Sequence, residues 1–138
     1  METVLVSSGV ILALLDADSP LHMQALAGIE GLRDRGASPL LTNFIVAETF
    51  SVLTVALGPD AGRTWLRHNI WPVERVSEAD EERAREIILE QENGGLKAGY
   101  ITYTGAASMA VMERLGAAGI FSLDPVIGEF GVCSGPVK

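Results

Sequence analysis

The sequence is poor in the side chains that most often bind metals or form cross-links. Its 138 residues include one cysteine, Cys133, and two histidines, His22 and His68. A single cysteine excludes an intramolecular disulfide and a metal site built from cysteines. The two histidines do not stand at a spacing typical of metal ligands, so we expect both to pack against the fold or to lie on its surface.

Long hydrophobic runs are also absent. The longest apolar stretch covers residues 9–15, which is far shorter than the roughly 18 residues that a membrane-spanning helix needs. No positively charged segment precedes it, as a secretory signal would require. Together with the single cysteine, these absences predict a cytoplasmic protein that has no membrane segment.

Basic residues are scarce. Lys and Arg total 10 against 18 Asp and Glu, which gives a formal net charge of -8. Such a charge repels polyanions at long range. The balance argues against a general nucleic-acid binder, and an action on RNA would need a local basic patch or a bound cation.

Hydrophobic residues, by contrast, make up 48% of the chain, and charged residues make up 20%. This composition is typical of one folded domain with one sizeable core. We expect the domain to cover residues 1–133 and a short flexible tail to cover residues 134–138. Apolar runs of strand length alternate with amphipathic runs of helix length, which predicts an α/β domain in which helices cover a parallel sheet.

The expected boundaries of these elements follow from apolar periodicity and from capping residues. The expected strands cover residues 3–6, 39–41, 71–73 and 119–123, and the proline in the third weakens it. The expected long helices cover residues 20–35, 43–57, 60–69, 78–92 and 105–115. The expected caps are Ser19, Thr42 or Asn43, Ser77 with Asp80, and Thr104. A short helix is expected after residues 7–9, and a flexible connection over residues 93–99.

Polar residues follow the ends of two expected strands. Ser7 follows the first strand, and Asp124 follows the last. Glu48 lies about a turn and a half into the helix after the second strand, and Gly105 lies in the first turn of the last helix. Parallel sheets of this kind bind ligands beyond the carboxyl ends of their strands. These four positions are therefore the candidate functional site.

The segments around these positions resemble one family. Over residues 3–133 the chain resembles the PIN domain and, within it, the ribonuclease toxins of VapC type; the matching segments are residues 4–10, 42–48, 103–112 and 121–124. The resemblance implies a three-layer α/β/α domain with a central, mostly parallel sheet of four or five strands. It also implies a metal-dependent endoribonuclease, in which four acids hold magnesium or manganese. RNA would be the substrate and an antitoxin-like protein a partner.

Two of the four acids of this family are replaced in this chain. By position, Glu48 and Asp124 match and would bind the metal, whereas Ser7 and Gly105 stand where the family has aspartate. The replacements take the formal charge of the site from about -4 to about -2, and a magnesium site supplies negative charge as well as oxygen ligands. Ser7 still offers a neutral oxygen, but Gly105 offers only its backbone. We therefore expect weak or no catalytic activity.

Two classes of function remain open. The first is a metal-dependent endoribonuclease of toxin type, in which Glu48 and Asp124 hold the cation and Ser7 contributes an oxygen. The second is a non-catalytic PIN module, which keeps the fold to bind an antitoxin-like protein, a second copy of itself, or RNA that it does not cut.

The middle of the chain carries more apolar surface than one face of a sheet can readily cover. The residues concerned are Leu53, Val55, Leu57, Trp65 and Ile70. Large exposed apolar patches usually mark interfaces, so we expect the chain to form a homodimer.

Overall fold

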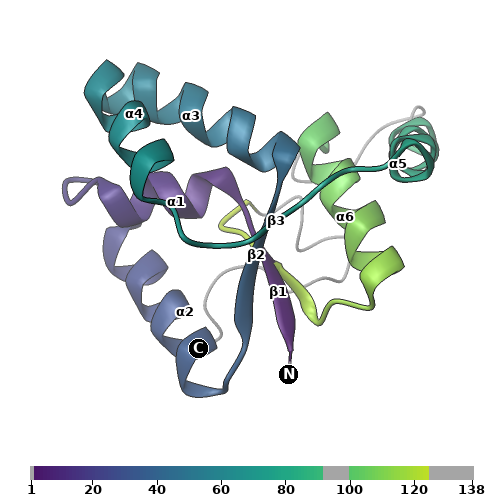
Figure 1. The fold of residues 1–138 in the computed structure, drawn as a ribbon, viewed down its shortest axis with the longest axis horizontal. Helices are drawn as coiled ribbons and strands as arrows, with labels where there is room; N and C mark the ends of the chain where they lie inside the picture. The colour runs from purple at the N-terminus through teal and green to yellow at the C-terminus, as the bar shows by residue number, and fades with distance from the viewer. Residues whose placement is uncertain (1, 92–99, 125–138) are drawn as a thin grey trace.

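A computed structural model describes residues 2–91 and 100–124 of the chain. These residues form four strands, β1 (Thr3–Val6), β2 (Ser38–Thr42), β3 (Val73–Glu74) and β4 (Gly119–Phe121). They form six helices, α1 (Ser8–Leu15), α2 (His22–Asp34), α3 (Asn43–Leu57), α4 (Pro59–His68), α5 (Glu78–Leu89) and α6 (Tyr103–Leu115). Figure 1 shows the sheet between α1 and α2 on one side and α5 and α6 on the other.

The four strands run parallel, in the spatial order β3-β2-β1-β4. β1 is central, and its Val4 lies opposite Pro39 of β2 and Gly119 of β4. The expected parallel sheet is therefore confirmed, with four strands in the described residues. Because β2 and β3 extend the sheet in one direction and β4 extends it in the other, the direction of sheet growth reverses at β1.

Successive residues of the central strands face opposite sides of the sheet. Val4 and Val6 are buried in a core that also contains Phe121 and residues of α1 and α2. Leu5 and Ile120 are buried in a second core, which contains residues of α5 and α6. One core on each face of the sheet confirms the expected three-layer α/β/α arrangement.

Two of the expected helix caps are confirmed. Thr42 Oγ1 accepts a hydrogen bond from Ile45 N at the start of α3. Ser77 and Asp80 form the expected reciprocal capping box at the start of α5. Each pair satisfies backbone N–H groups that a helix start otherwise leaves without partners.

The other two expected caps are wrong. Ser19 Oγ accepts from Leu21 N within a turn, and α2 begins only at His22. Thr104 lies inside the first turn of α6, and the cap is Thr102, whose Oγ1 accepts from Gly105 N. The backbone of Thr102 is extended, as a cap residue requires, and the helix follows it directly.

Several expected ends differ from the observed ones. α4, α5 and β4 end at His68, Leu89 and Phe121, which is one to three residues before their expected ends. Such shifts are common because helix ends fray and strands lose their partners gradually. The expected connection over residues 93–99 and the expected tail lie outside the described residues. Among the described helices, none is long and apolar enough to cross a membrane.

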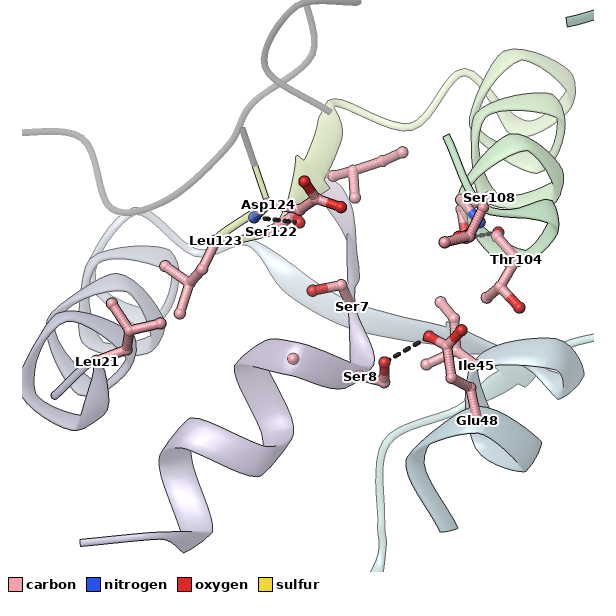
Figure 2. A pocket seen from close by; sticks show the side chains of 14 residues that line it. Ser7, Ser8, Leu21, Ile45, Glu48, Thr104, Ser108, Ser122, Leu123 and Asp124 are labelled. Carbon is pink, nitrogen blue, oxygen red and sulfur yellow. Dashed lines mark hydrogen bonds between the residues drawn. The ribbon is translucent and has the colours of Figure 1, made fainter. Parts of the chain in front are cut away.

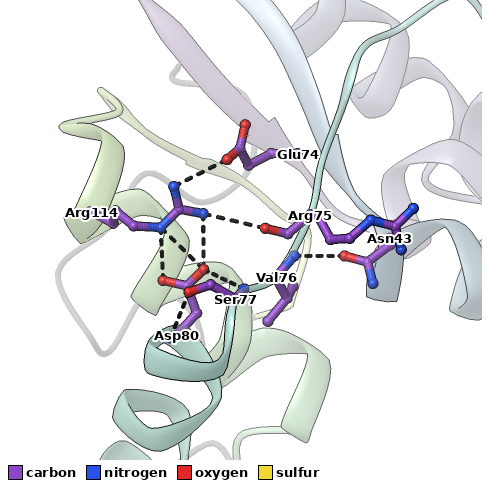
Figure 3. Close-up of polar contacts among 7 residues, drawn as sticks. All are labelled: Asn43, Glu74, Arg75, Val76, Ser77, Asp80 and Arg114. Carbon is purple, nitrogen blue, oxygen red and sulfur yellow. Dashed lines mark hydrogen bonds and ion pairs between the residues drawn. The ribbon is translucent and has the colours of Figure 1, made fainter.

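Arg114 of α6 ties three elements together (Figure 3). Its guanidinium donates to Asp80 of α5 at 2.9 Å and pairs with Glu74 of β3 at 3.1 Å. The Asp80 side chain is only 3% exposed. The hydrogen bonds from Arg114 hold the pKa of Asp80 below its usual value, although burial opposes this. Beside this cluster, Asn43 Oδ1 at the start of α3 accepts from Val76 N at 2.7 Å.

Candidate functional site

The carboxyl ends of β1 and β4 lie side by side in the sheet. Val6 is the register partner of Phe121, and the next backbone group, Ser7 N, donates to Phe121 O at 3.0 Å. After β1 the chain continues into α1 and then to β2 on one side, whereas β4 lies on the other side. α/β sheets leave a crevice for ligands at such a reversal of strand order.

A cleft of about 330 Å³ lies at this reversal. Its walls come from the turn between β1 and α1, from α3, from the start of α6 and from the residues that follow β4. Ser7, Glu48, Gly105 and Asp124 all line it. The structure therefore brings the four positions singled out in the sequence together in one cleft.

Glu48 reaches the cleft from α3, of which it is the sixth residue, and it is half-buried. The hydroxyl of Ser8, the first residue of α1, donates to Glu48 Oε1 at 2.5 Å. Within the described part of the chain, no other hydrogen bond to this carboxylate is found. In Figure 2 the Asp124 carboxylate lies above Ser7 and the Glu48 carboxylate lies to the right of Ser7. Two acids thus face one cleft from two different layers of the fold.

Asp124 follows β4 and is exposed. Its backbone N–H donates to the hydroxyl of Ser122 at 3.0 Å, and Ser122 itself is buried. This local bond between residues two apart is of the kind that forms turns, and it lies directly after the strand. Asp124 thus has a turn role, as its place before Pro125 indicates, and lines the cleft as well.

Ser7 and Gly105 bring no charge to the cleft. Ser7 is the N-cap residue of α1 by its backbone, but its hydroxyl makes no cap hydrogen bond. Gly105 is the third residue of α6, and its N–H donates to Thr102 Oγ1 at 3.0 Å. A carboxylate at this first turn would be favoured by the helix dipole. Glycine has no side chain that could make this interaction.

The sequence reasoning missed that hydroxyl groups line the cleft. Beyond Ser7, the hydroxyl residues that line it are Ser8, Thr102, Thr104, Ser108 and Ser122. The sequence positions of two of these residues indicated that they would lie near the cleft. Ser8 directly follows a candidate residue, and Ser108 stands three residues after Gly105 and so shares its helix face.

The oxygen atoms of the cleft are of the chemical type that a hard cation binds, but they carry little negative charge. Among the described residues that line the cleft, every side-chain polar atom belongs to a carboxylate or a hydroxyl, and oxygen is the ligand that magnesium and manganese prefer. Only two of these side chains are acids, and the described residues contain no group of three or more His, Cys, Asp or Glu that could hold a metal. These carboxylate and hydroxyl side chains therefore support weak binding of a cation.

The two histidines lie away from this cleft. His22 Nδ1 is 2.8 Å from Ala13 O, which links the start of α2 to α1. His68 is exposed near the end of α4. Neither lines the cleft. The packing and surface roles expected for them agree with these positions.

No model of a protein family matches the sequence, and no curated protein matches it at a significant level. Solved structures do match. VapC20 of Mycobacterium tuberculosis, a toxin that cleaves the sarcin-ricin loop, matches with a TM-score of 0.76 and 22% identity over 94% of this chain and 96% of that chain. VapBC2 of Rickettsia felis, bound to a DNA fragment from its promoter, matches with a TM-score of 0.69 and 9% identity over 96% of both chains.

A toxin-antitoxin complex from Klebsiella pneumoniae matches with a TM-score of 0.59 and 11% identity, over 86% of this chain and 84% of that chain. At these identities a likeness establishes the fold and not the activity. The chain therefore has the α/β fold of VapC PIN-domain structures, with a parallel sheet of four strands and six helices in its described residues.

Proposed function

We propose that this chain is a PIN-domain protein of VapC type whose cleft derives from a metal-dependent endoribonuclease site and retains little of that activity. One observation carries the proposal. Ser7, Glu48, Gly105 and Asp124, the four positions at which the family has acids, come from separate segments and line one cleft at the strand-order reversal. The fold likeness to a toxin that cleaves the sarcin-ricin loop supports the same class.

Each residue of the cleft has a distinct part in this proposal. Glu48 and Asp124 would hold magnesium or manganese, and Ser7 would contribute a neutral oxygen. When bound, such a cation supplies charge to offset the phosphate and activates water for phosphodiester cleavage. Ser8 donates a hydrogen bond to Glu48, and Gly105 stands where the family has an acid.

Weak activity follows from charge and placement. Two carboxylates give the described cleft a formal charge of about -2, and no Lys, Arg or His lines it to attract the RNA backbone. RNA carries a negative charge at every phosphate, and the chain has a net charge of -8. Without a well-held cation, the RNA and the protein repel each other.

A cleavage assay on a fluorogenic single-stranded RNA tests the proposal. The proteins compared are the parent chain, Ser7→Asp, Gly105→Asp and the double variant, each with manganese and with chelator. We expect little metal-dependent cleavage by the parent and about tenfold or more cleavage by the double variant over either single variant. The reason is that acids of one cation site are non-additive.

The matched controls are Glu48→Gln in the parent and in the double variant. Robust cleavage by the parent that Glu48→Gln abolishes would show that two carboxylates suffice, and the site would not be impaired. A double variant that is folded but gains no activity over the parent would count against these positions being the lost acids of the family.

The second candidate function is a non-catalytic module that binds an antitoxin-like protein. An apolar groove favours it. Two adjoining pockets, of about 450 and 230 Å³, share Leu15, Trp65, His68 and Asn69, between the end of α1 and α4. A groove of this kind suits the apolar face of a partner helix.

Co-expression with an acidic, antitoxin-like reading frame directly upstream of the gene tests this candidate. We expect the two chains to elute together in gel filtration. An Ala61→Arg variant should separate them, because Ala61 lines the groove. Independent elution of two folded chains would rule out that partner.

A further inference from the structure

We propose that Ser8 is a positioning residue, which holds the Glu48 carboxylate in the orientation that a divalent cation needs. The inference rests on the proposed function, since it concerns the cation of the same cleft. The observation behind it is the hydrogen bond from Ser8 Oγ to Glu48 Oε1, which joins two residues 40 positions apart in the chain.

The Ser8 hydroxyl is a fixed donor. Ser8 is the first residue of α1, and it is only 7% exposed. The residue before it, Ser7, is bonded through its backbone to Phe121 O of β4. The backbone next to Ser8 is therefore held by the sheet, and Ser8 is more buried than Glu48, which is half-buried.

Glu48 is the side chain that gains from such a donor. A free glutamate samples several side-chain torsions, and ordering them on cation binding costs conformational entropy. One oxygen, Oε1, is already held by Ser8. Figure 2 shows the Glu48 carboxylate turned toward the open centre of the cleft, with Ser7 and Thr104 across from it. The bond thus orders the ligand in advance of the cation, as partners of metal ligands do in general.

Ser108 provides a matched control. It lines the same cleft and is 4% exposed. Its Oγ donates to the backbone oxygen of Thr104 in its own helix, at 2.9 Å, and so does not bind an acid. Replacing Ser108 removes one buried hydroxyl from the cleft and leaves the Glu48 contact intact. Any general effect of losing a hydroxyl here appears in both serine variants.

The experiment measures binding of manganese alone to the full chain, by electron paramagnetic resonance of the free ion. The background is the Ser7→Asp and Gly105→Asp double variant, which has four acids. We expect Ser8→Ala to weaken manganese binding by about tenfold, the lower end of what outer partners of metal ligands contribute. We expect Ser8→Thr to restore it, since threonine keeps the hydroxyl, and Ser108→Ala to leave it within about twofold.

The outcomes separate the two proposals. A double variant that binds manganese no better than the parent would overturn the proposed function, and the role of Ser8 with it. A double variant that binds manganese well, with Ser8→Ala behaving like Ser108→Ala, would overturn the role of Ser8 alone. If Ser8→Ala does not fold, Ser8→Thr against Ser8→Val makes the same comparison, because threonine has a hydroxyl where valine, of nearly the same shape, has a methyl group. Equal affinities of that pair would overturn the role of Ser8.

Discussion

Gly28 of α2 lies against the ring of Phe121 in β4. A Cβ built on Gly28 would be 2.1 Å from Cζ of Phe121, closer than any real side-chain contact. Phe121 is buried, and the next residues along the chain are Ser122, Leu123 and Asp124 of the cleft. The absence of a side chain at Gly28 therefore lets α2 pack close to the strand that delivers Asp124.

Gly28→Ala should destabilise the fold by about 1–3 kcal/mol, because overpacking forces the ring or the helix to move. Gly31→Ala in the same helix is the control. A Cβ on Gly31 meets nothing within 4 Å, and alanine in an exposed helix position should stabilise by about 0.5–1 kcal/mol. Urea unfolding at pH 7 measures both free energies. Equal effects of the two substitutions would show that the Phe121 contact does not restrict α2.

The pair of Asp80 and Arg114 predicts how stability depends on pH. Hydrogen bonds from Arg114 hold the pKa of Asp80 below its usual value of 3.8. A carboxyl whose pKa is lower in the folded state stabilises the fold above its unfolded pKa. That contribution is lost as the pH falls below about 3.8 and through the lower, folded value.

Asp80→Asn isolates this charge. At pH 7 we expect a loss of about 1–3 kcal/mol, since asparagine can still accept the capping bond but cannot pair as an ion with Arg114. Unfolding by urea at a series of pH values from 7 downward measures the difference between parent and variant. The difference should shrink as the pH falls below 4. A difference that stays constant over this range would contradict the charge pairing.

The exposed apolar surface predicts a homodimer, with one correction to the residues that form it. Leu53 is completely buried in the fold and does not contribute, whereas Val55 and Ile70 are 87% and 89% exposed. Ile70 also lines the apolar groove beside α4. Light scattering at micromolar concentration should give a mass above the 14.6 kDa of one chain.

Ile70→Asp should reduce that mass, because a charge within an apolar interface is costly. Met23→Asp is the control, since Met23 is 73% exposed on α2 and does not line the groove. A parent chain that scatters as a clean monomer would remove the homodimer hypothesis. Equal dissociation by both substitutions would place the interface elsewhere.

The sequence predicted the sheet and the place of the cleft because both depend on local patterns. The apolar run before Ser7 and the one before Asp124 identify β1 and β4 without knowledge of their partners. By contrast, the pattern of α3 is apolar on most sides, so the sequence did not show that Leu53 faces inward and Val55 outward. Tertiary packing decides this, and helix periodicity alone does not.

The contacts within the cleft were beyond sequence reasoning for a related reason. Ser8 and Glu48 meet only because α1 and α3 pack together, and nothing local to either residue indicates the bond. The choice of Thr102 over Thr104 as the cap of α6 depends similarly on where the chain leaves the core at Ile101, which is buried. Long-range packing determines both.

Anomalous diffraction from manganese tests the central claim most directly, which is that Glu48 and Asp124 are the remaining half of a four-acid cation site. The crystal would contain the Ser7→Asp and Gly105→Asp double variant, soaked in manganese. We predict an anomalous peak within coordination distance of Glu48 and Asp124 and of at least one of the new aspartates. A folded double variant with no peak in the cleft, or with manganese bound to only one of Glu48 and Asp124, would contradict the account.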